Sequence, residues 1–170
     1  MIVAVQRSMV GHAMLILFIG MIAGMGLLSS LIGGVEWWPG KLLSFQLPGP
    51  TDAWVRTHLG GMLNAFLILL VALVLPILQV NAQRARVVGW LFVCTGWANT
   101  VFYWAAIFSA NRALTFGDNR FGASSLFSVI GLIPGLVFAI VSLIAVFLLA
   151  CAAFSSRSDD SRAFSTSKSI

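Results

Sequence analysis

The sequence predicts an all-α fold, an integral membrane bundle of four helices. Hydrophobic residues make up 59% of the 170 residues and charged residues only 9%. A water-soluble domain carries about 25% charged residues, so this chain cannot cover itself with a polar surface. Its apolar residues fall into long runs of roughly the 20 residues that a helix needs to cross a bilayer. Backbone groups in lipid must be hydrogen-bonded within their own segment, so these runs are expected to be helices.

The apolar runs also set the organisation of the chain. They cover about residues 9–32, 58–80, 87–109 and 126–154. Together they form one predicted transmembrane domain, 1–154, and too few residues remain for a separate soluble domain. The first run is too long for the apolar part of a signal peptide, so we expect it to be retained. The stretch 155–170 is rich in serine and charged residues and is expected to be a disordered tail.

The distribution of charge predicts the topology. Ten Lys and Arg residues outnumber five Asp and Glu residues, giving a net charge of +5. The cations lie singly at the ends of the runs, as in membrane proteins. They do not form the basic patch that would indicate nucleic-acid binding. Six of the ten fall on the side of the two termini, so both termini are expected in the cytoplasm.

The predicted loops are unequal. The two on the outer side, 33–57 and 110–124, are long, whereas the inner loop, 81–86, is a short connection. Trp37 and Trp38 in the first outer loop are typical of an aromatic anchor at the membrane surface. More of the chain is placed on the outer side, which suggests that the functional site lies there.

Polar residues inside the apolar runs are candidates for function, because burying them in a membrane is costly. His58 begins the second run, and Asn64 lies roughly 9 Å deeper at about 1.5 Å per helical residue. The same count places Asn99 and Tyr103 in the outer half of the membrane. Thr95, Asn99 and Tyr103 recur every four residues, so they share one face of the third helix.

The two histidines lie at opposite depths, which excludes a metal held by both within one subunit. His12 is near the inner end of the first run and is expected to serve helix packing or the interface. A single histidine leaves a coordination position open, as catalytic metal sites do. His58 is equally consistent with an interfacial histidine at a helix start, and Tyr103 with the aromatic belt. Asn64 and Asn99 also fit hydrogen bonds that simply hold helices together.

Other familiar sites are missing from the sequence. Cys94 and Cys151 have no metal-binding or disulfide spacing and are expected to behave as small apolar residues. Acidic residues are nearly absent from the apolar runs, which disfavours a proton-coupled transporter. Gly20, Gly24 and Gly26 in the first run could support close helix packing.

Short motifs along the whole chain resemble the bacterial styrene oxide isomerases. They include Met9-Val10-Gly11-His12, Gly33-Gly34-Val35-Glu36, Trp54-Val55-Arg56-Thr57-His58, Leu63-Asn64, Gly96-Trp97-Ala98-Asn99, Phe102-Tyr103 and the stretch 111–117. The family pattern has an acidic residue before the Gly-Trp pair, and this chain has Thr95 there. The order and spacing of these motifs make the resemblance specific.

The resemblance implies a four-helix, multi-pass enzyme of the bacterial inner membrane, assembled as a homotrimer with ferric haem b near the subunit interfaces. It implies that His58 is the axial ligand of the haem iron. Tyr103 and Asn64 would position the epoxide oxygen. Arg56 and Arg112 would bind the haem propionates, although each also fits a solvated residue facing lipid headgroups.

The implied reaction, part of styrene degradation, is a Meinwald rearrangement that converts an aryl epoxide such as styrene oxide to an aryl acetaldehyde without net redox change. The haem iron would act as the Lewis acid. Trp97, Asn99, Phe102 and Trp104 would line a dry substrate pocket. One alternative is a membrane haem module for electron transfer without enzymatic activity, and another is a structural protein without a cofactor.

Overall fold

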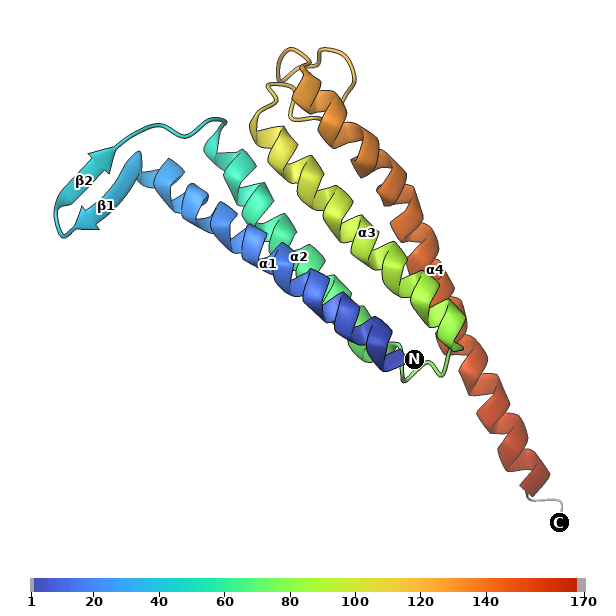
Figure 1. Cartoon of the computed structure of the whole chain (residues 1–170). Helices are drawn as coiled ribbons and strands as arrows, with labels where there is room; N and C mark the ends of the chain where they lie inside the picture. The colour runs from blue at the N-terminus through green and yellow to red at the C-terminus, as the bar shows by residue number, and fades with distance from the viewer. Residues whose placement is uncertain (1, 168–170) are drawn as a thin grey trace.

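The structure is a computed structural model that describes residues 2–167, with side chains described for 3–154. Its helices are α1 (Ile2–Ile32), α2 (Thr51–Val74), α3 (Ala82–Ile107) and α4 (Leu126–Ser167). They lie side by side, with both chain ends on one side of the bundle and the two long loops on the other (Figure 1). The mostly helical fold predicted from composition is confirmed.

The helix boundaries differ from the predicted ones, and the change at the start of α2 affects the site. This helix begins at Thr51 instead of 58, so His58 lies within it and not at its entry. Asp52 in its first turn is favourable because a carboxylate interacts well with a helix N-terminus. The helix ends at Val74, just before Pro76, which cannot continue the hydrogen-bond ladder. Asn81 then caps α3, since its side chain accepts a 2.9 Å hydrogen bond from the backbone N–H of Arg84.

Among the described residues, three helices are long and apolar enough to cross a membrane, not the four predicted. These spans are Val3–Ile32, Thr51–Val74 and Leu126–Phe154. Helix α3 is long, but it carries Thr95, Asn99 and Thr100 along its length and is therefore less apolar. Its crossing of the membrane remains a prediction.

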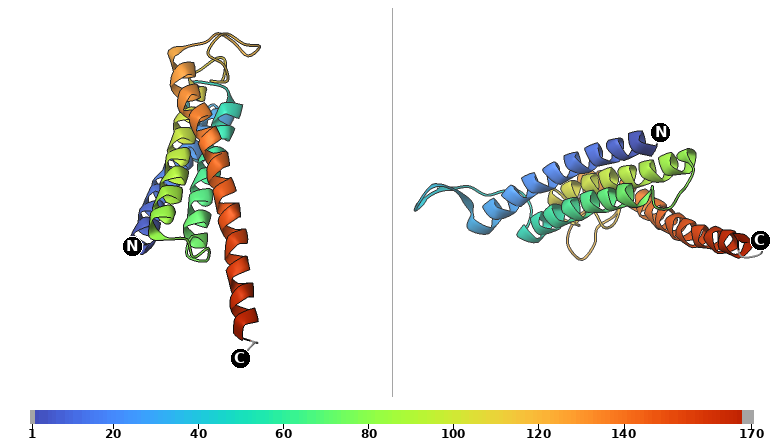
Figure 2. Two further views of the ribbon diagram at one scale, coloured as in Figure 1. Left: turned by 90° about the vertical axis from the view of Figure 1, so that its right-hand side faces the viewer. Right: turned by 90° about the horizontal axis from the view of Figure 1, so that it is seen from below.

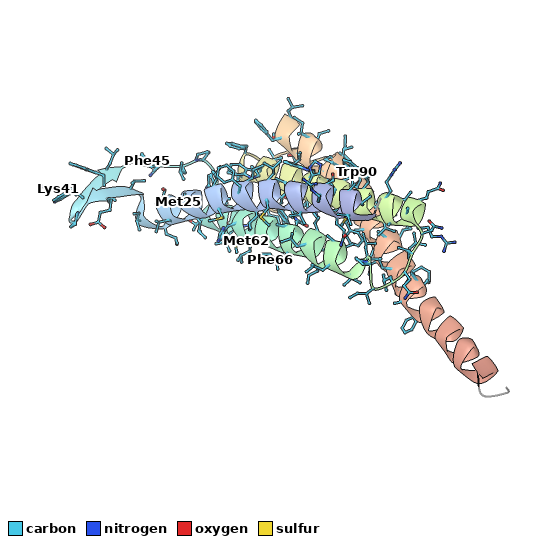
Figure 3. All side chains as sticks on the ribbon, turned by 60° about the horizontal axis from the view of Figure 1, so that its bottom comes forward. Met25, Lys41, Phe45, Met62, Phe66 and Trp90 are labelled. Carbon is cyan, nitrogen blue, oxygen red and sulfur yellow. The ribbon has the colours of Figure 1, made fainter. Side chains whose placement is uncertain are left out.

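The first outer loop contains a β-hairpin that the sequence analysis does not predict. Strands β1 (Gly34–Trp38) and β2 (Lys41–Ser44) pair antiparallel. The turn between them uses Gly40 at a φ of +76°, a conformation in which glycine carries no steric penalty. Figure 3 shows Lys41 and Phe45 at this hairpin, beyond the end of the helices. Trp37 and Trp38 are exposed, as an aromatic anchor requires.

Helix α3 is central to the packing, because it contacts α1, α2 and α4. The buried core between α1, α2 and α3 is apolar and includes Met9, Ile16, Ile68 and Phe92. Among the described elements, α4 packs against α3 alone, and Figure 2 shows it diverging from the other helices toward the C-terminus. Most large apolar side chains of α4 are therefore exposed.

Helix α4 extends into the stretch that is predicted to be a disordered tail. Its backbone is helical to Ser167, so the predicted disordered stretch 155–170 overlaps a helix. Adding turns to an existing helix avoids the cost of nucleation, which explains how a serine-rich stretch can continue it. The side chains of 155–170 lie outside the described residues, and the disorder of this tail remains a prediction.

Candidate active site

His58 lies on the side of α2 that faces α1. Its Nδ1 atom is 2.9 Å from the backbone carbonyl oxygen of Gly20. A carbonyl can only accept, so Nδ1 carries the proton and Nε2 of the neutral ring has a free lone pair. A backbone carbonyl on one ring nitrogen is the usual way in which a histidine is oriented for metal binding through the other.

Glycines allow this contact by bringing α1 and α2 close together. A Cβ atom built on Gly61 would lie 2.9 Å from the Cα of Gly20, so the two backbones nearly touch. A Cβ on Gly24 would lie 2.8 Å from the Nδ1 and Cε1 atoms of His58, and a Cβ on Gly26 would overlap the ring of Trp54. The expected packing role of Gly20, Gly24 and Gly26 is confirmed.

The surface around His58 is apolar. The ring itself is half-buried, and Met62 and Phe66 follow it one and two turns later along α2. Figure 3 shows these two side chains and Met25 on the neighbouring α1. Met25 and Phe66 are exposed, so His58 opens onto an apolar surface and not into solvated loops.

A second group of polar residues lies between α2 and α3. The amide Nδ2 of Asn99 donates a 3.0 Å hydrogen bond to Oδ1 of Asn64, which is buried. The ring of Tyr103 packs directly on Gly60, where a Cβ atom would overlap it. Thr57 also donates a 3.1 Å hydrogen bond to the backbone carbonyl of Tyr103. The structure thus brings together Asn64, Asn99 and Tyr103, and within the described residues the Tyr103 hydroxyl has no hydrogen-bond partner.

His58 does not join this group within one chain. Positions 58 and 60 are about 200° apart around a helix, so they face opposite directions. His58 faces α1, whereas Gly60 and Asn64 face α3. The sequence predicts that all these residues lie in the outer half of the membrane, and this shared depth remains a prediction. Within a single chain, however, His58 lies on a different face of α2 from Gly60 and Asn64.

The predicted substrate-pocket aromatics are also separated. The indole N–H of Trp97 donates a 3.2 Å hydrogen bond to Nδ1 of His12 on α1. Phe102 packs toward Gly135 of α4. The ring of Trp104 meets that of Trp54 on α2 edge to face, with the centroids 5.9 Å apart. Trp97 and Trp104 share a face of α3 but lie about 10 Å apart along it, and Phe102 faces another way. Each of the three therefore contacts a different helix, and within one chain they do not form one pocket.

His12 and Thr95 both make their polar contacts with other residues of the helix bundle. His12 accepts the Trp97 bond and packs edge to face against Trp90, which confirms it as a helix-packing histidine. Thr95 is buried, and its hydroxyl donates a 2.8 Å hydrogen bond to the carbonyl of Leu91 on its own helix. Its polar group is therefore satisfied without a ligand.

The two predicted propionate-binding arginines share an acidic neighbour that the sequence analysis overlooks. Asp52 forms a 3.0 Å ion pair with Arg112 and lies 3.9 Å from Nη2 of Arg56, which is too far for a hydrogen bond. The Nη2 atom of Arg56 is buried without a hydrogen-bond partner in the described part of the chain. Arg56 therefore has an unused donor, while Arg112 is neutralised. The i, i+4 spacing of Asp52 and Arg56 is the signal that could have identified the acid.

The outer loop between α3 and α4 is held by a buried asparagine. The Oδ1 atom of Asn111 accepts hydrogen bonds from the hydroxyls of Ser109 and Ser128, both 2.7 Å. Its amide donates to the carbonyls of Thr115 and Gly117 at 2.9 and 3.0 Å. Asn111 is fully buried. Phenylalanine and glycine alternate with polar turn residues in this loop, which predicts a structured segment. The hydrogen bonds of Asn111 confirm that prediction.

The donor set around His58 suits one class of metal group. Across the described residues, no cluster of three His, Cys, Asp or Glu side chains could hold a metal ion. A bare ion such as Zn²⁺ needs at least three protein ligands. A haem brings four ring nitrogens of its own and needs only one axial ligand from the protein. His58, with its free Nε2 and apolar surroundings, fits that requirement.

Comparison with known proteins agrees with these observations. A family model described as styrene oxide isomerase matches residues 5–154. A curated protein of Pseudomonas fluorescens named styrene-oxide isomerase is 39% identical over 143 residues, which cover 84% of this chain and 85% of that protein. The range matched by the family model, residues 5–154, spans the positions of the site described above.

Proposed function

Because the chain belongs to the styrene oxide isomerase family, we propose that it is an isomerase that converts aryl epoxides such as styrene oxide to aryl acetaldehydes. The match over residues 5–154 is the observation that carries this proposal. In the rearrangement, the benzylic C–O bond breaks and a hydride moves from the other epoxide carbon to the benzylic carbon. The oxygen stays on the second carbon as an aldehyde. No proton, electron or water is gained or lost.

Haem b fits the residues that surround His58. The Nδ1 bond to Gly20 leaves Nε2 for an axial ligand, and Met25, Met62 and Phe66 provide an apolar surface for a macrocycle. When bound, a ferric haem supplies a Lewis acid for the epoxide oxygen. The buried unpaired Nη2 of Arg56 can donate to a propionate, and it is better suited to this than Arg112, which is engaged by Asp52.

The chain's own polar residues would orient the epoxide. Asn99 donates a hydrogen bond to Oδ1 of Asn64. This bond fixes the Asn64 amide and leaves its N–H₂ group free to donate to another acceptor. The Tyr103 hydroxyl has no partner among the described residues, and both groups can donate to an epoxide oxygen. Donors held in place before the reaction stabilise charge that develops on an oxygen.

The reaction also requires that water be kept away, because water would trap the benzylic cation as a diol. The residues around Asn64 and Asn99 meet this requirement. Ala65, Ile68 and Ala98 are buried beside them. In the described part of the chain, the printed contacts of Asn64, Asn99 and Tyr103 include no acid and no histidine, and the rearrangement needs neither, since it has no net proton transfer.

The opposite directions of His58 and Tyr103 favour a site shared between subunits. An epoxide whose oxygen meets both a metal on His58 and the hydroxyl of Tyr103 needs the two residues to approach it from two sides. Within one chain they are separated by α2 itself. A homotrimer in which His58 of one subunit faces the partner subunit's Tyr103 and Asn64 satisfies this requirement. The exposed apolar face of α4 also leaves surface for such an assembly.

The same proposal includes the membrane topology. Three helices are apolar enough to span a bilayer, and α3 lies among them with a similar length and contacts with all three. We therefore place four helices across the bacterial inner membrane. Six of ten cations lie on the side of the termini, which puts both termini in the cytoplasm.

The decisive experiment combines a spectrum with a product assay. The full chain, purified in lipid nanodiscs with haem supplied, should show a Soret band that shifts when styrene oxide is added, and it should form phenylacetaldehyde. A low-spin spectrum typical of two axial protein ligands, without any product, would favour an electron-transfer module instead. A colourless protein under the same haem supply, also inactive, would favour a structural role.

The shared site has its own test. Subunits carrying His58→Ala and subunits carrying Tyr103→Phe are each expected to be impaired. Trimers assembled from both kinds of subunit then distinguish the two arrangements. If the site lies between subunits, some interfaces combine the native His58 of one variant with the native Tyr103 of the other, and these trimers regain activity. If both residues act within one subunit, mixing restores none, and the assembly proposal is wrong while the isomerase proposal stands.

A further inference from the structure

A hollow of about 490 Å³ lies at the outer end of α3, and the proposed isomerisation does not use it. We call it the outer hollow. It is an open hollow bordered by the segment before α2, the end of α3, the loop after it and the start of α4. Its lining consists of Pro48, Gly49, Pro50, Ile107, Phe108, Ser109, Ala110, Arg112, Phe121 and Phe127.

The walls of the outer hollow are held in place by specific contacts. The Trp54 indole donates a 3.0 Å hydrogen bond to the carbonyl of Pro48. Gly49, at a φ of +77°, packs against the carbonyl of Ile107, where a Cβ atom would overlap it. On the other side, the 3.0 Å ion pair between Arg112 and Asp52 ties the loop to α2. The hollow is therefore a built feature of the fold and not a gap between mobile loops.

The chemistry of the lining is aromatic and close to neutral. The rings of Phe108 and Phe127 lie 5.4 Å apart, and the guanidinium of Arg112 lies 4.1 Å from the centre of the Phe121 ring. Asp52 pairs with Arg112, and Arg120, whose guanidinium lies 4.7 Å from the centre of the same Phe121 ring, is not among the lining residues. The lining itself therefore carries little net charge and does not select an anion. Aromatic rings prefer to pack against other aromatic rings. A compact, uncharged aromatic molecule is the ligand that this lining fits.

The position of the outer hollow connects it to the candidate active site. Ile107 in its wall lies one helical turn beyond Tyr103 on α3. Trp104, the residue after Tyr103, packs edge to face against Trp54. The indole N–H of Trp54 in turn donates a hydrogen bond to Pro48 in the wall of the hollow. An aryl group held in the hollow would thus lie about one helical turn from the backbone of Tyr103, the residue that is proposed to orient the epoxide.

We propose that the outer hollow is a capture site that binds the aryl epoxide before it reaches Tyr103. This inference rests on the proposed function for the identity of the substrate. The three phenylalanines bind the aryl ring, and spare N–H groups of Arg112 are available to the epoxide oxygen. Capture raises the local concentration of a sparingly soluble substrate at the entrance of the site and leaves the chemical step unchanged.

A kinetic test uses Phe127→Ala in the full chain with haem bound. The value of kcat/KM for styrene oxide should fall about three- to tenfold, the effect of losing one aromatic contact, while kcat at saturation stays unchanged. Phe147→Ala is the matched control, because Phe147 is 67% exposed on the same helix and lies outside the hollow. Equal kcat/KM values in the two variants, or a loss in kcat alone, would overturn the proposal.

A binding test does not depend on activity. Ala110→Cys places a thiol in the lining, and Leu114→Cys places one on the same loop outside the hollow. Each variant is treated with N-ethylmaleimide, with and without acetophenone as an inert aryl probe, and labelling of that cysteine is measured by peptide mass spectrometry. Acetophenone should slow labelling at position 110 and leave position 114 unaffected.

The outcomes separate the two proposals. Equal labelling at position 110 with and without acetophenone in an active isomerase would refute the capture site and leave the proposed function intact. Protection at position 110 in a protein without isomerase activity would support the aryl site and refute the proposed function. Protection by decane as strong as that by acetophenone would show a lipid-chain groove and would also refute the capture site.

Discussion

Gly24→Ala tests whether the orientation of His58 controls haem binding. The added Cβ atom would lie 2.8 Å from the Nδ1 and Cε1 atoms of the imidazole, well inside van der Waals contact. The ring must rotate or α1 must move away from α2. Either movement breaks the 2.9 Å hydrogen bond from Nδ1 to the carbonyl of Gly20.

The magnitude follows from two opposing effects. Replacing glycine by alanine inside a helix favours the helix by about 0.5–1 kcal/mol. Overpacking of this kind costs about 1–3 kcal/mol, and the lost hydrogen bond costs about 0.5–1.5 kcal/mol. The variant is therefore expected to be destabilised by about 0.5–4 kcal/mol. Haem affinity is more sensitive, because removing the partner that orients a metal-binding histidine typically lowers affinity about 10- to 100-fold.

Gly11→Ala is the matched control, since Gly11 lies on the same helix with nothing within 4 Å of an added Cβ atom. Both variants would be titrated with ferric haem in nanodiscs, following the Soret absorbance, and assayed for phenylacetaldehyde formation. Gly11→Ala should bind haem like the native chain, and Gly24→Ala should bind it more weakly. Equal haem affinity in the two variants would refute the link between the α1 contact and the metal ligand.

Three further predictions concern single residues. His58→Ala should lose the Soret band and isomerase activity together, and full haem occupancy with turnover in that variant would remove His58 as the ligand. Tyr103→Phe should keep its haem spectrum but lose about 10²-fold in kcat, as when one oriented donor is removed; unchanged kinetics would exclude the hydroxyl from the reaction. Asn111→Ala should lower the apparent Tm in detergent by about 5–10 °C, because several buried partners lose their hydrogen bonds. The exposed loop variant Phe116→Ala is its control, and an equal Tm in both would contradict the structural role of Asn111.

The helices could be predicted because an apolar segment in lipid must satisfy its own backbone hydrogen bonds, and an α-helix does so within a single segment. The apolar runs correctly locate all four helices, and the deviations are at their ends. Helix α2 begins at Thr51, outside the apolar run, since its first two turns carry Asp52 and Arg56, charged residues that keep this stretch out of an apolar run. The hairpin at Gly34–Ser44 was missed for a related reason. Pro39-Gly40 indicates a turn, but the strands around it are too short and irregular for an alternating pattern.

The candidate site could be predicted in part. Helical spacing correctly places Asn99 and Tyr103 on one face of α3, and depth correctly matches them with Asn64. Neither spacing nor depth shows which neighbouring helix a face meets. The direction of His58 depends on the contact between Gly20 and Gly61, which belong to different helices. The separation of Trp97, Phe102 and Trp104 toward three helices has the same origin.

The structure of α2 links these features to the need for more than one copy of the chain. A helix with its side chains is about 10 Å across, so residues on its opposite sides cannot reach the same small molecule. His58 is held toward α1 by its hydrogen bond to Gly20, whereas Tyr103 packs on Gly60, which lies about 160° away around α2. Moving either ring around α2 toward the other would break the His58 hydrogen bond or the packing on Gly60. If both residues act on one epoxide, they must therefore belong to different subunits, and the contact that orients His58 within its own chain is also what directs it toward a neighbour.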